Sequence, residues 1–526
     1  MRDFHLPGRS TVYCQRAAIA TSHPLATSAG LDVLRRGGNA VDAAICAAAV
    51  LAVVEPEQTG LGGDCFALLA PGSGGLHALD GSGWSPRAIG PELLTAQGHA
   101  VMPMDGPHSV TVPGAVDAWF RLLEDHGSWG MAEVLAPAIR LAEEGHPVHE
   151  RVAEDWKACV EKLRRDPETA AIFLPQGRPP RPGEIFRQPL LAQSLREIGE
   201  GGRDAFYAGR IAEDMVARLR QLGGVHELDD FAEYRSCYRT PLAAGYRGME
   251  IVQCPPASQG FTVLAMLRLL AALDVGADDP LSPRRLHLFG EAAKLAYAAR
   301  NRLVADDPRS LQAALDWLGD DNIARLAAAI DPDRASPAPY PRRAGTDTVL
   351  VCAVDEKLNL VSLIFSIYQS YGSGIVAPRS GILLQNRGAG FALAEGHPNV
   401  LAGRKRPLHT IIPGMAMQDG RAVSAFGMVG GDFQPFGQAW LVSNVVDFGM
   451  SPQQAIDLAR AFPIDDAFRL ERGIAPETAE ALERMGHSPR YWPIPLGSAQ
   501  MIAIDRAGGV IAAGSDGRTD GCALGY

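Results

Sequence analysis

The stretch DPDRASPAPYPRRAGTD (331–347) leads directly into TVLVCAV (348–354), and this junction is the most informative point of the chain. The first segment is polar and rich in proline, so we expect a linker that cannot pack into a core. The second segment is rich in valine and other apolar residues and predicts a strand. The junction therefore places Thr348 at the start of a sheet element.

The turn DEKLN (355–359) joins this strand to a second one, LVSLIFSIY (360–368), and so predicts a β-hairpin. If residues 355 and 360 pair approximately, Thr348 comes opposite Ile367, within one residue of Ser366. The hairpin thus puts a small hydroxyl beside Thr348. Serine and threonine are also common on sheets for structural reasons, so the pairing alone leaves the role of both hydroxyls open.

A glycine pair in FGMVGGDFQ (426–434) is the next candidate element. Gly430 and Gly431 follow a predicted strand, where their backbone N–H groups can donate to an oxyanion. Double glycines also occur in ordinary loops, so this pattern is weak by itself. The chain has no G-x-S-x-G nucleophile elbow, which argues against an α/β-hydrolase type of serine enzyme.

The two sides of the junction differ in character. Before it, we expect a helix at 24–34, an alanine-rich helix capped by Asn39 that runs to about residue 54, and a mostly helical region from about 131 to 330. After it, short β segments dominate, with one helix at 438–447. Helices, then strands, then helices indicate layered α and β architecture rather than βαβ alternation.

Length and composition describe a globular chain without a nucleic-acid footprint. Its 526 residues favour two or three domains, or one large interwoven domain. The formal net charge of -11 argues against nucleic-acid binding, because phosphate contacts need a basic patch. The longest apolar stretch, 43–54, is too short to span a bilayer. We therefore expect no membrane partner.

The N-terminus and the metal-ligand residue types point to a plain cytoplasmic protein. The first twenty residues carry charges and a proline where a secretory apolar region would lie, so a cytoplasmic location is expected. The 8 cysteines are scattered without a C-x-x-C pair, which predicts free thiols. The 13 histidines form no H-E-x-x-H or H-x-H cluster, so neither a metal nor another cofactor is expected.

Seven collinear segments carry a resemblance to a known family. The opening HPLATSAGLDVLRRGGNAVDAAICAAAVLAVVEPEQTGLGGDCFALL (23–69) resembles that of γ-glutamyltransferases. The resemblance covers nearly the whole chain from about residue 20, and it continues through SVTVPGAVDAW (109–119), TDTVLVCAVD (346–355), YGSGIVAPRSGILLQN (371–386), KRPLHTIIP (405–413), MVGGD (428–432) and SDGRTDGCALGY (515–526). It implies an α/β (α+β) fold, the four-layer αββα sandwich of N-terminal-nucleophile hydrolases.

The resemblance also implies self-cleavage between Asp347 and Thr348. The threonine hydroxyl attacks the preceding carbonyl, an N-to-O acyl shift gives an ester, and water releases two chains, 1–347 and 348–526. The new α-amine has a pKa of about 8, so it can serve as the base for the hydroxyl beside it. The two chains are expected to form one interwoven domain, either as a heterodimer or as a dimer of heterodimers.

Three further residues match family positions around this nucleophile. Ser366 matches the hydroxyl residue that hydrogen-bonds the threonine, and Gly430 and Gly431 match the oxyanion hole. The resemblance therefore assigns the same positions that the hairpin and the glycine turn had indicated.

The substrate-binding positions depart from the family pattern. Ser82 stands where γ-glutamyl enzymes hold the substrate carboxylate with an arginine, and Gly390 stands where they hold the amine with an aspartate. His409 and Thr410 replace a serine pair, and Tyr368 replaces an asparagine. Charge-assisted contacts contribute about 1.5 to 3 kcal/mol each, so we predict poor activity on glutathione.

The remaining pattern is similar to oxamate amidohydrolase and to acylase-like homologues. Arg387, next to Asn386 in the Q-N-R-G-A run, can bind a small carboxylate or form a structural salt bridge. His409 and Tyr368 either orient the substrate amide or fill the pocket. The leading hypothesis is a hydrolase that acts on a small carboxylate-bearing amide with water as acceptor. The alternatives are a γ-glutamyltransferase or glutathione hydrolase that transfers to an amine acceptor, and an inactive, uncleaved binding homologue.

Overall fold

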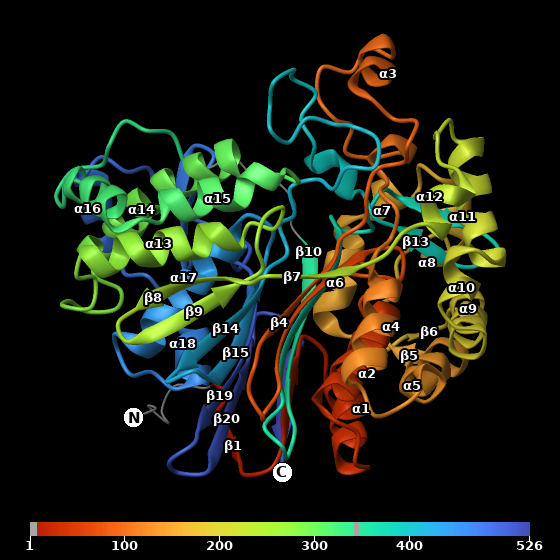
Figure 1. Ribbon diagram of the computed structural model, residues 1–526, viewed down its shortest axis with the longest axis horizontal. Coiled ribbons are helices and arrows are strands. Elements are labelled where there is room, and N and C mark those ends of the chain that lie inside the picture. Colours follow the sequence, from red (N-terminus) through yellow and green to blue (C-terminus); the bar gives the residue numbers. More distant parts are fainter. Residues whose placement is uncertain (1–7, 341–346) are drawn as a thin grey trace.

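The structure is a computed structural model that describes residues 8–340 and 347–526. Two seven-stranded sheets face each other, and helices cover the outer face of each (Figure 1). The layers therefore follow the order helix, sheet, sheet, helix. This confirms the predicted four-layer sandwich.

The first sheet holds the strand that begins at the junction. Its strands lie in the order β21 (Cys522–Gly525), β2 (Ala18–Thr21), β10 (Asp347–Val354), β11 (Leu360–Tyr368), β3 (Asp64–Ala70), β4 (His77–Gly81) and β7 (Cys237–Arg239). The main helices packed against its outer face are α1 (Pro24–Arg35), α2 (Ala40–Val54), α4 (Ala115–His126) and α5 (Met131–Glu144).

The second sheet is built in the same way. Its order is β1 (Val12–Cys14), β20 (Val510–Ser515), β19 (Ser498–Asp505), β15 (Arg421–Val429), β14 (Pro413–Gln418), β9 (Met249–Gln253) and β8 (Leu242–Tyr246). Its outer helices are α13 (Gly260–Ala272), α14 (Pro283–Leu303), α17 (Phe433–Val446) and α18 (Pro452–Asp457). Both sheets thus contain strands from before and after the Asp347–Thr348 bond.

Smaller elements surround this sandwich. They are α3 (Pro91–Ala96), η1 (Pro107–Ser109), β5 (His146–Pro147), α6 (Glu150–Ala158), α7 (Val160–Leu163), α8 (Pro167–Phe173), β6 (Ile185–Phe186), α9 (Pro189–Gly201), α10 (Arg203–Tyr207), α11 (Arg210–Gln221), α12 (Leu228–Ala232), α15 (Pro308–Trp317), α16 (Asp320–Ala328), β12 (Ile375–Ala377), β13 (Ile382–Leu384), η2 (Arg387–Gly390), β16 (Ala461–Ile464), β17 (Ala467–Leu470), α19 (Pro476–Arg484) and β18 (Pro489–Tyr491). None of the described helices is long and apolar enough to cross a membrane.

Strand β10 is buried on both faces, which explains its continuous apolar sequence. Leu350 and Cys352 pack into the core between the two sheets, whereas Val349 and Val351 pack into the core shared with the outer helices. A half-exposed strand would have alternated with polar residues. Helix α2 lies over this sheet with all its residues buried and is capped by Asn39, as predicted.

One prediction about the elements needs correction, and two others need added detail. The helix expected at 438–447 begins earlier, at Phe433, because Pro435 lies in its first turn, where proline is tolerated. The region from about 131 to 330 is mostly helical, as predicted, although it also supplies β7 to the first sheet and β8 and β9 to the second. Propensity is a weak guide where the tertiary context supplies strand partners.

The last point concerns the linker, whose residues 341–346 lie outside the described part. Residues 331–340 add no buried residue to the core, as predicted, but individual residues among them form hydrogen bonds with neighbouring elements. His287 Nε2 lies 2.8 Å from the Asp331 carbonyl oxygen, and Tyr340 Oη lies 2.8 Å from His487 Nδ1. Polar partners buried on α14 and after α19 thus hold a segment whose own composition is too polar for a core.

Candidate active site

Thr348 lies at an irregularity in the β10–β11 hairpin. Asp347 pairs with Tyr368 and Val349 pairs with Phe365, so Thr348 alone faces two residues of β11, one of which is Ser366. The predicted hairpin is confirmed, but its pairing is shifted by one residue because Val354 pairs with Leu360, and the bulge is a feature that the turn did not reveal. Bulges locally redirect side chains and are frequent beside active sites. Thr348 is 3 % exposed at this position.

Two glutamines hold Thr348. Its backbone N–H donates to Gln58 Oε1 at 3.1 Å, and its Oγ1 accepts from Gln434 Nε2 at 3.3 Å. Gln434 is fixed in turn because its Oε1 accepts from the Ile412 N–H at 3.2 Å. The sequence had given no reason to select either glutamine. The only available signal was that Gln434 lies three residues after the glycine pair.

The glycine pair lies between β15 and α17, close to Gln434. Gly430 has φ +120° and Gly431 has φ +58°, and the first of these values is strained for any residue with a Cβ. The carbonyls of both glycines accept hydrogen bonds from the first turn of α17. Within the described ranges, neither glycine N–H donates a hydrogen bond, so both are available to an oxyanion.

The buried guanidinium of Arg387 contacts Ser366. Arg387 Nη1 donates to Thr410 Oγ1 at 2.7 Å, and its Nη2 donates to Ser366 Oγ at 3.3 Å. The guanidinium carbon lies 4.2 Å from the centre of the Tyr368 ring. The structure therefore brings together four residues that the sequence had nominated, Ser366, Tyr368, Arg387 and Thr410.

Arg387 has no carboxylate in ion-pair contact among the residues that the structure describes. It is fully buried, and its Nε has no hydrogen-bond partner there. Burial lowers the pKa of the guanidinium to about 10, so the group stays cationic near neutral pH. A buried charge is unfavourable unless it is paired, and this site therefore suits an anionic ligand group.

His409 supports this cluster as a neutral group. Its Nδ1 accepts from the Ile411 N–H at 3.4 Å, so its Nε2 carries the proton and donates to Asp64 Oδ2 at 3.0 Å. Burial, followed by the charge of Arg387, lowers the pKa of His409 to about 4, although Asp64 acts in the opposite direction. The contact is therefore a hydrogen bond to a neutral imidazole rather than an ion pair at neutral pH.

Asp64 is a functional residue that sequence reasoning missed. It is fully buried on β3, and its Oδ1 accepts from the Gly83 N–H at 2.9 Å, the Gly114 N–H at 3.0 Å and Gln385 Nε2 at 2.9 Å. Through these hydrogen bonds and the one with His409, Asp64 connects strand β3 to the segments around Gly83, Gly114 and Gln385. Its partners come from far along the chain, so no local pattern identifies it.

We expect Asp64→Asn to destabilise the protein by about 3 kcal/mol, because the asparagine amide would present N–H groups to donors at one of the two oxygen positions. Urea unfolding of the processed protein measures this change. The exposed pair of Asp125 with Arg121 supplies the control, and Asp125→Asn should change the free energy of unfolding by less than about 0.5 kcal/mol. Equal effects in both variants would contradict the role of Asp64.

Two nominated residues do not join the cluster. Asn386 uses its side chain in local contacts, donating to the Met104 carbonyl at 2.7 Å and accepting from the Gln369 N–H at 3.2 Å. Ser82 donates its hydroxyl to Asp80 Oδ1, and no hydrogen bond links it to Arg387 within the described residues. Both residues thus shape the loops around the site.

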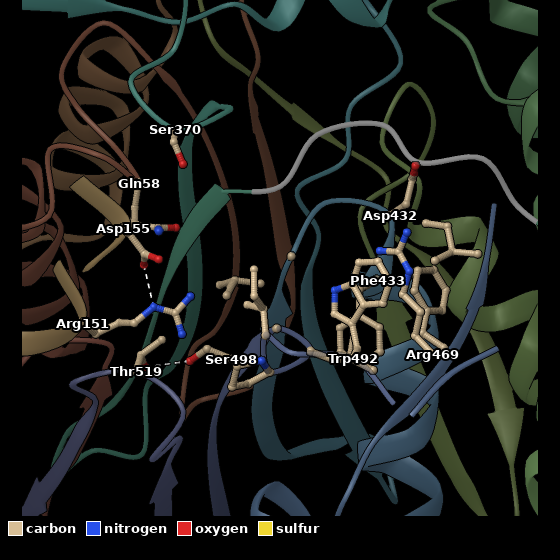
Figure 2. A pocket seen from close by; sticks show the side chains of 18 of the residues that line it. Gln58, Arg151, Asp155, Ser370, Asp432, Phe433, Arg469, Trp492, Ser498 and Thr519 are labelled. Atoms are coloured by element: carbon tan, nitrogen blue, oxygen red, sulfur yellow. Dashed lines mark hydrogen bonds and ion pairs between the residues drawn. The ribbon is translucent and has the colours of Figure 1, made fainter. Parts of the chain in front are cut away.

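A pocket of about 340 Å³ opens beside the glycine pair. Gly430 and Gln58, which contact the nucleophile region, line it. Figure 2 shows Phe433, Trp492 and Arg469 on one side of the view and Gln58, Arg151 and Asp155 on the other. The pocket therefore adjoins Gly430 and Gln58, whereas neither Thr348 nor Arg387 is among its lining residues.

A second polar cluster lies apart from this site. In the described ranges, one group of three possible metal ligands has its ligand atoms within 4.8 Å of one another, namely His287, Glu291 and His487. The two imidazoles already share a 2.8 Å hydrogen bond, and Lys294 donates to Glu291 at 2.7 Å. The ammonium group of Lys294 disfavours a second cation there. Sequence spacing could not reveal this cluster because His487 lies 200 residues from His287.

The fold and the site together define a class of protein. A four-layer sandwich with a buried threonine near the start of an inner strand, beside a glycine pair whose N–H groups donate no hydrogen bond among the described residues, is the architecture of N-terminal-nucleophile hydrolases. Residues 26–526 match the family model described as gamma-glutamyltranspeptidase, and the chain belongs to this family. The family is enzymatic, and an N-terminal threonine nucleophile is typical of it.

Individual relatives differ in the activities that their names state. The chain is 37% identical to the glutathione hydrolase-like YwrD proenzyme of Bacillus subtilis, over 96% of this chain and 98% of that protein. It is 35% identical to the oxamate amidohydrolase proenzyme of Klebsiella pneumoniae, over 98% and 99%. The crystal structure of cephalosporin acylase from Bacillus halodurans superposes with a TM-score of 0.92 at 35% identity, covering 100% of this chain and 99% of that one.

Proposed function

We propose that this chain is a proenzyme that cuts itself between Asp347 and Thr348 and then hydrolyses a small, carboxylate-bearing amide through an acyl-enzyme. The contacts of Arg387 carry the substrate part of this proposal: a fully buried guanidinium beside Ser366 without a carboxylate partner in the described residues. Chains 1–347 and 348–526 would stay together, since each contributes strands to both sheets.

The reaction follows from the contacts of Thr348. After cleavage its α-amine takes the proton of its own hydroxyl as Oγ1 attacks the amide carbon. The developing oxyanion accepts hydrogen bonds from the N–H groups of Gly430 and Gly431. The C–N bond breaks, the proton passes to the leaving amine, and an ester remains on Oγ1. Water then attacks this ester and gives a proton to the α-amine. The bond between the acyl carbon and Oγ1 breaks, Oγ1 takes the proton back from the α-amine, and the carboxylic acid is released.

Arg387 supplies the binding contact for the acyl half. Its hydrogen bonds to Thr410 and Ser366 fix the guanidinium beside the nucleophile, and a carboxylate of the acyl group can pair with it. Tyr368 lies against the guanidinium and keeps this contact away from water, which strengthens it. This arrangement favours an amide such as oxamate, in which a carboxylate is close to the scissile carbonyl.

γ-Glutamyl transfer is the second candidate, because several relatives are named glutathione hydrolases. Ser82 and Gly390 stand where the family's carboxylate-binding arginine and amine-binding aspartate would be, and neither can supply a charge. We therefore favour hydrolysis of a simpler acidic amide over glutathione cleavage.

A substrate panel tests the proposal. The processed protein should release acid from monoamides of short dicarboxylic acids, such as oxamate and succinamate, at rates that added glycylglycine leaves unchanged. Its kcat/KM for glutathione should be at least about 100-fold lower than its kcat/KM for these monoamides. A difference of this size corresponds to the loss of one or two charged contacts. Glutathione cleavage at a comparable rate, stimulated by the dipeptide, would establish the transferase alternative instead.

A further inference from the structure

The pocket beside Gly430 is larger than the leaving group of a primary amide requires. Its volume is about 340 Å³, which is within the size range of ligand-binding pockets. The ammonia released from a primary amide needs only the space of about one water molecule, roughly 30 Å³. A protein that cleaved primary amides alone would have no use for the remaining space.

The position of the pocket indicates which half of a substrate enters it. This step rests on the proposed function, in which the acyl carboxylate pairs with Arg387 and the carbonyl carbon lies between Thr348 Oγ1 and the glycine N–H groups. Gly430 and Gln58 line the pocket, and Gln58 accepts a hydrogen bond from the Thr348 N–H, whereas neither Arg387 nor Thr348 is among the lining residues. With the acyl carboxylate held by Arg387, the leaving nitrogen is therefore placed on the side of Gly430 and Gln58, toward the pocket.

The chemistry of the pocket wall indicates the character of that half. Apolar side chains form much of the lining: Phe433, Phe462, Ile464, Trp492, Ile494 and Leu496. The guanidinium of Arg469 lies 3.8 Å from the centre of the Trp492 ring and covers one of its faces. An indole supported in this way presents a fixed flat surface to a ligand ring.

The charged residues of the wall are neutralised by partners. Arg469 pairs with Asp465 at 2.9 Å, and Arg151 pairs with Asp155 at 2.7 Å (Figure 2 shows the second pair). Asp432, the remaining charged residue of the lining, pairs with Arg300. Paired in this way, they offer little net attraction to an anionic or a cationic leaving group. The pocket thus favours an uncharged ring over a charged amine.

We propose that this pocket binds the amine half of the substrate and that this half carries an aromatic ring, so that the natural substrate is an N-aryl or N-arylalkyl amide of a short dicarboxylic acid. Primary amides are then cleaved less efficiently, because they bind only on the Arg387 side of the site and leave the pocket empty. Aromatic binding energy also helps to hold the scissile bond against Thr348, so the ring raises kcat/KM.

Matched substrates and variants test this assignment in the processed protein. Succinanilic acid should be cleaved with a kcat/KM about tenfold above that of succinamate, since ring stacking contributes up to about one decade. Trp492→Ala and Ile494→Ala should remove most of this advantage and leave succinamate cleavage within about twofold. Ile494 is 57% exposed, so its replacement should not disturb folding.

Tyr491→Ala is the matched control, because Tyr491 is an exposed neighbour that does not line the pocket. It should preserve the preference for the anilide. Equal kcat/KM values for anilide and primary amide, or a Trp492→Ala effect that is the same on both, would overturn the pocket assignment while acidic-amide hydrolysis stands. Conversely, Trp492-dependent cleavage of uncharged anilides without any cleavage of acidic amides would support the pocket and refute the proposed carboxylate site.

Discussion

Replacing Thr348 with alanine is expected to leave the protein as one uncut chain of 56.0 kDa without amidase activity. One hydroxyl serves both events in the proposed mechanism: it attacks the Asp347 carbonyl during maturation and the substrate carbonyl afterwards. The unchanged protein should instead separate on a denaturing gel into chains of 347 and 179 residues, because cleavage at residue 347 of 526 leaves 179. Activity should fall by at least about 10³-fold.

Thr348→Ser separates chemistry from folding. Serine keeps the hydroxyl and the contact with Gln434, so this variant should still cut itself and retain measurable activity. Mass spectrometry of the small chain should then show a new N-terminal serine. Cleavage that persists in Thr348→Ala would move the scissile bond elsewhere, and full activity of an uncut chain would refute the N-terminal nucleophile.

The features that could be predicted from the sequence are local ones. A turn fixes a hairpin, and a hairpin fixes which residues face each other, so Ser366 could be placed near Thr348 from the sequence alone. The glycine pair was visible because a strand and a helix flank it closely. In each case the deciding contacts lie within a few residues of the turn.

The residues that escaped prediction make contacts across the whole chain. Gln58 lies 290 residues from Thr348, and Asp64 lies 345 residues from His409. Glutamine after a helix and aspartate at the start of a strand have many ordinary roles, so only the packing of the two sheets reveals their partners. The same reason explains the linker, whose residues 331–340 find buried polar partners on α14.

Replacing Arg387 with methionine is expected to lower kcat/KM for short acidic amides by about 10² to 10³-fold, because two charge-assisted contacts with the substrate carboxylate are lost. The fold should survive. Arg387 is a buried charge without an ion pair among the described residues, and replacing such a charge by an apolar side chain of similar volume is often neutral or stabilising. The melting temperature should therefore stay constant or rise.

A selectivity ratio distinguishes recognition from a general effect on catalysis. Arg387 also donates to Ser366, so its loss could slow every substrate equally. The ratio of kcat/KM for succinamate to that for its uncharged methyl ester removes this shared effect, and it should collapse in Arg387→Met. Arg387→Lys keeps the charge without the two-pronged geometry, so it should give an intermediate ratio. If the ratio were unchanged while both rates fell, Arg387 would position Ser366 and the substrate carboxylate would bind elsewhere.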